Sequence, residues 1–231
     1  NSIWLGNDPT STTDTASYNV ALGTTALDAI TTGDNNAGLG YNSLTALTTG
    51  AYNVGVGYAA GGGITTGDKN IAIGQNTMAG DTVTADANVA VGYRALQAAT
   101  SGGANIAIGQ DALLANTTGG NNVAVGNLAL DANTTADNNT AVGVNALGAN
   151  TTGSTNTAVG SRSFAASTTA AGGTAIGDRA LTANTTGNYN TAVGSLALGA
   201  NTTGANNTAV GYNCLGAATT ASHNTAMGYI C

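Results

Sequence analysis

Charged residues are scarce in this chain of 231 residues, which contains 4 lysine or arginine residues, no glutamate and a formal net charge of −7. Charged side chains make up 6% of the sequence, against roughly 25% in a typical soluble protein. Nucleic acids and anionic membrane surfaces are both bound through clustered basic side chains. A run of about 18 apolar residues, which would insert into a membrane, is also missing. The composition therefore argues against nucleic acid and membrane as partners.

Groups that carry catalysis are equally rare. There is one histidine, His223, and no cluster combines histidine, cysteine and aspartate, although active sites are built from such clusters. Calcium sites need several oxygen ligands that converge at fixed spacing, and no such spacing occurs among the aspartates. We therefore predict that the chain is not an enzyme and holds no cofactor or metal, and that His223 lies at a variable surface position.

Glycine is abundant, with 35 residues against one proline, and one glycine recurs at a fixed interval. From Gly6 to Gly228 every interval is 17 residues, except that from Gly74 to Gly92, which is 18. The extra residue lies within 81–87, where we expect a bulge at a corner that leaves the neighbouring repeats in register. Internal repeats of this length indicate a solenoid or an array.

The clearest repeat is NTAVGVNALGANTTGST, residues 139–155, whose residues we number as repeat positions 1 to 17. Position 1 is Asn in all repeats except those that carry Ser2 and Gly173. Position 3 is Ala or Gly except at Trp4, position 4 is always large and apolar, and position 5 is always Gly. Position 9 is mostly Leu, and positions 13 to 15 are usually Thr-Thr-Gly.

Short β-segments fit this repeat better than a helix does. Glycine costs about 1 kcal/mol in a helix interior, and Thr is a poor helix former. The segment N-T-A-V-G is typical of a strand that ends at a glycine able to adopt a positive φ at a corner. We predict an all-β fold, a parallel β-solenoid (β-roll) of about fourteen 17-residue coils, in which equivalent residues stack about 4.8 Å apart and buried Asn files pair their amides. A helical-repeat solenoid is the alternative.

The boundaries of the solenoid are predicted as one repeat domain over residues 1–231, a fragment of a longer fibre. Its first coil, 1–18, is atypical because it contains Trp4 and Pro9. Solenoids need their terminal strand edges covered, and Trp4 could cover this one.

The two faces of the predicted strand suggest self-association. Positions 2 and 4 point to one side and positions 1 and 3 to the other, and neither side carries charge. A strand covered on both sides is expected when one side faces its own coil and the other a partner chain. We predict a homo-oligomer, most simply a homotrimer, with a monomeric coil that fills two layers as the alternative. Position 2 is mostly Ile or Val up to Val123 and Thr from Thr140 onward.

The strings NIAIG, at 70–74 and 105–109, and NVAVG, at 88–92 and 122–126, resemble the head repeats of trimeric autotransporter adhesins. The longer unit NTAVGxxALxANTTG is similar to repeats in bacteriophage tail fibres. The resemblance implies a trimeric, left-handed parallel β-roll at a cell or virion surface. The adhesin head repeat is shorter than 17 residues, so the cross-section is expected to differ.

Three sets of residues are candidates for surface chemistry. Exposed aromatic side chains at position 6 could contact a glycan or only pack between adjacent coils: Tyr41, Tyr58, Tyr93, Tyr212 and Tyr229. Five Asn-Thr-Thr segments match the N-glycosylation pattern, although Asn and Thr also suit a tight turn: Asn116, Asn133, Asn150, Asn184 and Asn201. Cys214 and Cys231 share position 8 in consecutive coils, within disulfide range, but we favour unpaired, buried thiols.

Aspartates fall mostly at variable positions, such as Asp111 at position 7, and are predicted to be solvated surface carboxylates.

The function predicted from all of these features is a structural or adhesive extracellular fibre shaft, either a phage tail fibre or a bacterial surface adhesin that attaches to a host glycan or protein receptor. The alternatives are an ice-binding solenoid and a carbohydrate-binding β-helix protein. Adjacent threonines at positions 13 and 14 point to opposite faces of a strand, which argues against a flat ice-binding array there.

Overall fold

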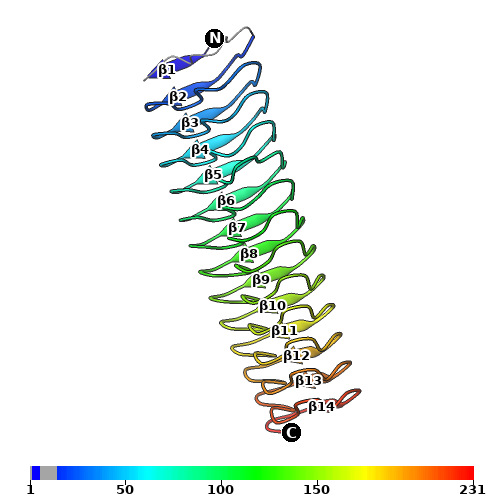
Figure 1. The fold of residues 1–231 in the computed structure, drawn as a ribbon. Coiled ribbons are helices and arrows are strands. Elements are labelled where there is room, and N and C mark those ends of the chain that lie inside the picture. The colour runs from blue at the N-terminus through cyan, green and yellow to red at the C-terminus, as the bar shows by residue number, and fades with distance from the viewer. Residues whose placement is uncertain (1, 6–14) are drawn as a thin grey trace. The chain divides into compact units, whose positions relative to one another are not determined.

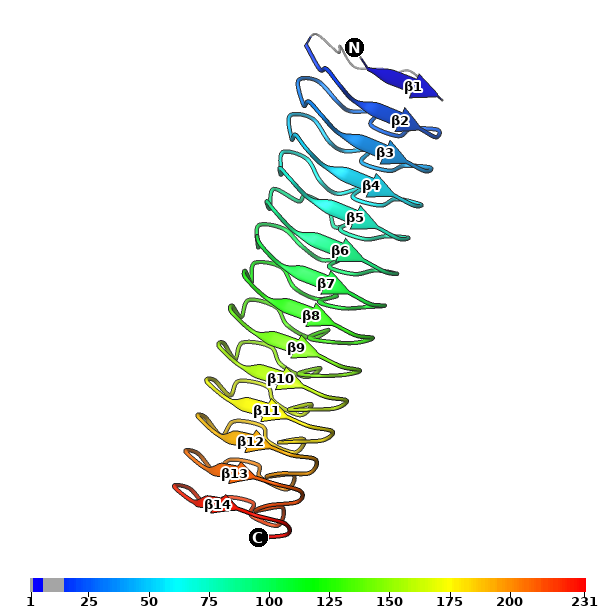
Figure 2. The same cartoon turned by 180° about the vertical axis from the view of Figure 1, so that it is seen from behind.

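The computed structural model describes residues 2–5 and 15–231, with the side chains of Trp4 and Leu5 left out of the description. Two compact units are distinguished, Asn1–Thr118 (unit 1) and Gly119–Cys231 (unit 2). The regular elements in the described part of both units are strands of three residues, one in each coil (Figures 1 and 2). The expected role of Trp4 and the position of Pro9 lie outside the described residues and side chains.

Unit 1 contains seven strands that pair in parallel with the next strand along the chain, each residue opposite its equivalent in the next coil. These strands are β1 Ile3–Leu5, β2 Val20–Leu22, β3 Ala37–Leu39, β4 Val54–Val56, β5 Ile71–Ile73, β6 Val89–Val91 and β7 Ile106–Ile108.

Unit 2 repeats the arrangement with seven further parallel strands in the same register. They are β8 Val123–Val125, β9 Thr140–Val142, β10 Thr157–Val159, β11 Thr174–Ile176, β12 Thr191–Val193, β13 Thr208–Val210 and β14 Thr225–Met227. The parallel β-solenoid with a 17-residue repeat is confirmed, and the helical-repeat alternative is wrong.

The middle residue of each strand, repeat position 3, points into the coil. Ala72 and Ala158 are fully buried there. The residue must be small because the Leu of position 9 fills the same space: a Cβ added to Gly55 would lie 2.8 Å from Leu44 Cγ. Each unit therefore has a thin core of stacked Ala and Leu side chains.

The position-5 glycines turn the chain at the end of every described strand from β2 onward. Gly40 has a φ of 127°, and a Cβ there would lie 2.6 Å from the carbonyl oxygen of Gly57 in the next coil. Both the positive φ and the close approach of neighbouring backbones require glycine. The corner predicted from the glycine interval is confirmed.

A file of buried Asn side chains at position 1 runs along each unit. The side-chain Oδ1 of Asn36 accepts from the backbone N–H of Asn53 at 2.8 Å and from its Nδ2 at 3.2 Å, and Asn53 Nδ2 also donates to Gly67 O at 2.8 Å. Gly67 belongs to the same coil as Asn53, so the Asn53 amide bonds both to the preceding coil and within its own coil, and its Oδ1 accepts from the Asn70 N–H of the next coil at 2.9 Å. These bonds confirm the expected Asn file.

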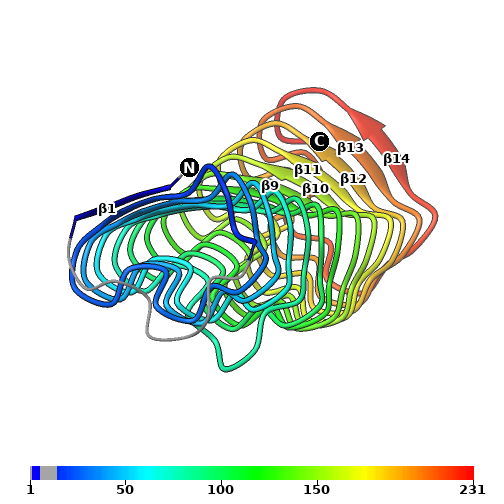
Figure 3. The ribbon, with the colours of Figure 1, turned by 90° about the horizontal axis from the view of Figure 1, so that it is seen from above.

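The extra residue within 81–87 is accommodated at a corner. Asp81 and Thr82 are exposed, while Val83 is buried and pairs with Ile64 of the preceding coil. A loop of the matching colour projects from unit 1 in Figure 3. β5 and β6 on either side keep their register, as expected.

Candidate functional site

The outer sheet face of unit 1 consists of the first and third residues of β2–β7, which are repeat positions 2 and 4. All of these residues are Val, Ile, Leu or Ala. Several remain exposed despite their size, with Leu22 at 48%, Ile108 at 40% and Ile73 at 38% exposed. A row of large apolar side chains without charge on an exposed sheet is typical of an interaction surface.

The equivalent surface in unit 2 has a different chemistry. We call the first and third residues of β9–β13 the Thr/Val face: the first residue of each strand is Thr, and the third is Val or, in β11, Ile. The threonines are half-buried, and Val142, Val159 and Ile176 are exposed. Within the described part of the chain these Thr hydroxyls make no hydrogen bond to protein, so they are free to bind water.

The five candidate tyrosines all lie on the surface, and four of them stack in pairs between adjacent coils. The Tyr41 and Tyr58 rings are 5.5 Å apart with planes 23° from parallel, and the Tyr212 and Tyr229 rings are 5.4 Å apart at 18°. The Arg94 guanidinium instead lies over the Tyr93 ring, with Arg94 Cζ 5.0 Å from the ring centroid. Stacking covers one face of each paired ring and leaves the edges and outer faces for contact with a partner.

The five candidate glycosylation sites are buried. The side chains of Asn116, Asn133, Asn150, Asn184 and Asn201 have no exposed surface. Asn116 occupies position 12 in unit 1. The other four occupy position 12 in unit 2, where Asn150 Nδ2 donates to Asn133 Oδ1 at 3.1 Å and to Gly153 O at 2.9 Å. Their burial argues against glycan attachment to the folded chain, because a transferase needs an accessible amide.

The position-12 file ends where the next coil lacks Asn. Asn150 is followed by Ser167, and Asn201 by Ala218. The Oδ1 atoms of Asn150 and Asn201 and the Ser167 hydroxyl are buried without a hydrogen-bond partner. Interruptions of the repeat, rather than a ligand site, account for these three atoms.

The side chains of the threonines at positions 13 and 14 point in different directions, as expected. At position 13 the hydroxyl donates to the backbone carbonyl of the next coil, as from Thr151 to Thr168 at 3.0 Å. At position 14 the side chain is exposed, as in Thr152. The position-13 hydroxyls are therefore already bound to protein, and the two files form no flat array together.

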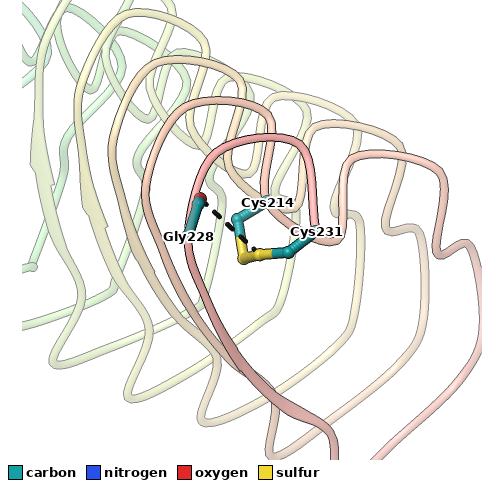
Figure 4. The surroundings of a disulfide bond; sticks show 3 residues. All are labelled: Cys214, Gly228 and Cys231. Carbon is teal, nitrogen blue, oxygen red and sulfur yellow. Dashed lines mark hydrogen bonds between the residues drawn. A yellow bond between two sulfur atoms is a disulfide. The ribbon is translucent and has the colours of Figure 1, made fainter.

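Cys214 and Cys231 form a disulfide between consecutive coils, with Cα atoms 4.7 Å apart (Figure 4). Our preference for unpaired thiols is wrong. In-register stacking places residues of the same position in adjacent coils at about this distance, which is within the range that a disulfide spans.

Asp111 is not a solvated carboxylate, because its side chain is buried against Arg94. The Arg94 guanidinium donates two hydrogen bonds to it, at 2.8 Å and 3.0 Å. These bonds lower the pKa of Asp111, against the opposing effect of its burial and with help from a hydrogen bond from Gln110. The pair could have been found in the sequence, since both residues occupy position 7 of consecutive coils.

Groups that would mark an active site are not brought together in the described residues. They contain no cluster of three or more His, Cys, Asp or Glu side chains that could hold a metal ion and no pocket. His223 is exposed, with Nε2 3.5 Å from Asn206 Nδ2. None of the described segments is a helix long and apolar enough to cross a membrane.

Comparison with known proteins finds no matching family model, no matching curated protein and no matching solved structure.

Proposed function

We propose that the chain is a structural or adhesive fibre shaft, of a phage tail fibre or a bacterial surface adhesin, in which copies associate through the outer sheet face of unit 1. The observation that carries this proposal is the uncharged apolar face that repeats from β2 to β7. Six coils spaced by about 4.8 Å and a strip about three residues wide give this face an area on the order of 300 Å². The largest apolar patch on a typical monomeric protein is about this size and is often functional.

A second copy of the chain is the partner that best fits this face. The face repeats the same side chains at every coil, so two copies that lie side by side offer each other equivalent apolar rows along their length. A closed arrangement of three copies would cover the face in all of them, as the resemblance to trimeric fibre repeats implies. The position-6 tyrosines, two residues beyond position 4, would lie at the edge of such an interface, where aromatic residues are common.

An extracellular location is part of the proposal and is supported by the Cys214–Cys231 disulfide, since disulfides persist mainly in oxidising compartments. The exposed tyrosines that the interface leaves free are the candidate contacts to a host glycan. The proposed role is attachment without turnover, so a glycan array should show binding while the bound glycan stays intact.

Mass in solution tests the association directly. Light scattering should give a multiple of the 22.1 kDa chain mass, three times that mass for a trimer. Ile73→Lys places a charge on the outer sheet face and should reduce the mass to that of one chain. Thr66→Lys adds the same charge at exposed position 14 of the preceding coil and should leave the assembly unchanged. A monomeric unmodified protein would contradict the proposal.

A further inference from the structure

The Thr/Val face of unit 2 is a two-dimensional grid of small groups. Along the stack the coils repeat at 4.7 Å, the Cα separation of Cys214 and Cys231. Along each strand, the Thr and Val side chains that point outward lie about 6.6–6.8 Å apart. Along the stack, the grid therefore repeats the Thr side chain, which carries a hydroxyl beside a methyl group. Along each strand, this Thr stands next to Val or Ile, which is purely apolar.

The grid is held rigidly. β9–β13 pair residue for residue, and the backbone N–H that opens each strand is bonded to the next coil, as Thr157 N to Gly173 O and Thr191 N to Asn207 O, both at 2.8 Å. Each Thr is β-branched and has few rotamers. The hydroxyl positions are thus set by the backbone rather than by mobile side chains.

The free hydroxyls distinguish this face from the other threonine files. Position-13 hydroxyls donate to carbonyls of the next coil, as Thr185 does to Thr202 O at 3.0 Å. The hydroxyls of Thr157, Thr174 and Thr191 have no such partner among the described residues, and each can bond to water. Apolar groups restrict the orientation of the first water layer, and fixed hydroxyls beside them can anchor that layer by hydrogen bonds.

We propose that the Thr/Val face of unit 2 binds the surface of ice. Water bound at regular intervals between rows of methyl groups is an ordered layer that can merge with a crystal plane, whose oxygen atoms also repeat periodically in two directions. The face contains no charged side chain that would bind water in another geometry. Unit 1 has the same backbone but Val, Ile or Ala in place of the Thr residues of this face, so it lacks the anchoring hydroxyls.

Thermal hysteresis and inhibition of ice recrystallisation by the full chain test this proposal. Thr174→Tyr with Thr191→Tyr raises two bulky rings from the middle of the face. Thr186→Tyr with Thr203→Tyr places the same rings at exposed position 14. Circular dichroism melts check that both proteins are folded. We expect the unmodified protein and the position-14 variant to be active and the Thr174/Thr191 variant to lose most of its activity.

Three outcomes would overturn the proposal: no thermal hysteresis of the unmodified protein at high concentration, equal loss in both variants, or a change in assembly mass in the Thr174/Thr191 variant that accounts for its loss. The last outcome would identify the face as a protein interface. Ice binding does not depend on the proposed fibre role, because Ile73→Lys tests association through unit 1 alone.

Discussion

Thr155 holds a backbone conformation that suits its residue type poorly. Its φ is 61°, in the left-handed region, where a β-branched residue is a rare outlier. Position 17 has a positive φ in every other described coil as well, and several of those coils carry Asn, which tolerates it better. The coil-to-coil hydrogen bond from Thr155 N to Asp137 O, at 3.1 Å, holds the residue there.

Thr155→Asn should therefore stabilise the protein. We expect the free energy of unfolding to rise by about 0.5–1 kcal/mol, because Asn relieves the left-handed strain. The reverse change one coil earlier, Asn138→Thr, should lower it by a similar amount. Urea denaturation followed by circular dichroism measures both, and a shift in the same direction for the two variants would refute this explanation.

The Arg94–Asp111 pair should make stability depend on pH at the acid end. Arg94 lowers the pKa of Asp111 in the folded state, so the stabilisation is present above the ordinary carboxyl pKa of about 3.9 and is lost as pH falls below it. Arg94→Met should lower the melting temperature at neutral pH, and the difference from the unmodified protein should shrink as Asp111 becomes protonated.

Arg162→Met is the matched control, since Arg162 occupies the same repeat position but is exposed and has no ion pair within the described residues. Its effect on melting temperature should stay constant with pH. A pH-independent effect of Arg94→Met would show that the guanidinium acts through packing alone.

At the scale of the coil, two departures from the repeat compensate each other. Phe164 replaces the usual Leu at position 9 and is fully buried, and Gly173 replaces Asn at position 1 of the next coil. A Cβ on Gly173 would lie 2.7 Å from Phe164 Cζ and closer still to Cε1. The aromatic ring thus occupies the volume that an Asn side chain fills elsewhere.

A double-mutant cycle tests this compensation. Phe164→Leu should leave a cavity and Gly173→Asn should clash with the ring, so each alone should destabilise the protein. The double variant restores the common repeat and should be more stable than the sum of the single effects predicts, with a coupling energy of about 1–3 kcal/mol. Chemical denaturation of the four proteins measures it, and additive effects would contradict shared use of the volume.

The strands and corners could be predicted from the sequence because glycine at position 5 and a large apolar residue at position 4 recur in every coil. The side of the strand that faces the core could not be fixed by alternation alone, which only separates positions 2 and 4 from position 3. The Leu of position 9 decides which side faces the core, because it leaves no room beside position 3 for a side chain larger than Ala. The burial of Asn116 and its equivalents was missed because Asn-Thr-Thr has the same composition in a solvated turn and in a buried amide file.

At the scale of the whole molecule, each coil exchanges hydrogen bonds with its neighbours in sequence, so stability should be local within each unit. The last coil of unit 2 shows this dependence. Gly228 N donates to Val210 O at 2.9 Å and Ile230 N to Tyr212 O at 3.0 Å, and the disulfide adds a covalent link between the same two coils.

Reduction of the disulfide should loosen only the end of unit 2. We expect faster amide hydrogen exchange at Gly228 and Ile230, because local opening becomes easier, and unchanged exchange at Gly57 and Gly74 in unit 1. Mass spectrometry with and without reductant measures both regions. Cys231→Ala should reproduce the effect without reductant, and an equal increase in unit 1 would contradict local stability.

The corner that carries Asp81 and Thr82 shows where the polypeptide tolerates additional length. The extra residue is accommodated in an exposed segment at the corner, and β5 and β6 on either side of it stay paired in register. A peptide grafted between these two residues would be displayed to solvent by a scaffold that does not need to be redesigned around it. For the same reason, an affinity tag or a fluorophore attached at this corner would leave the residues of the outer sheet face of unit 1 and of the Thr/Val face of unit 2 unchanged.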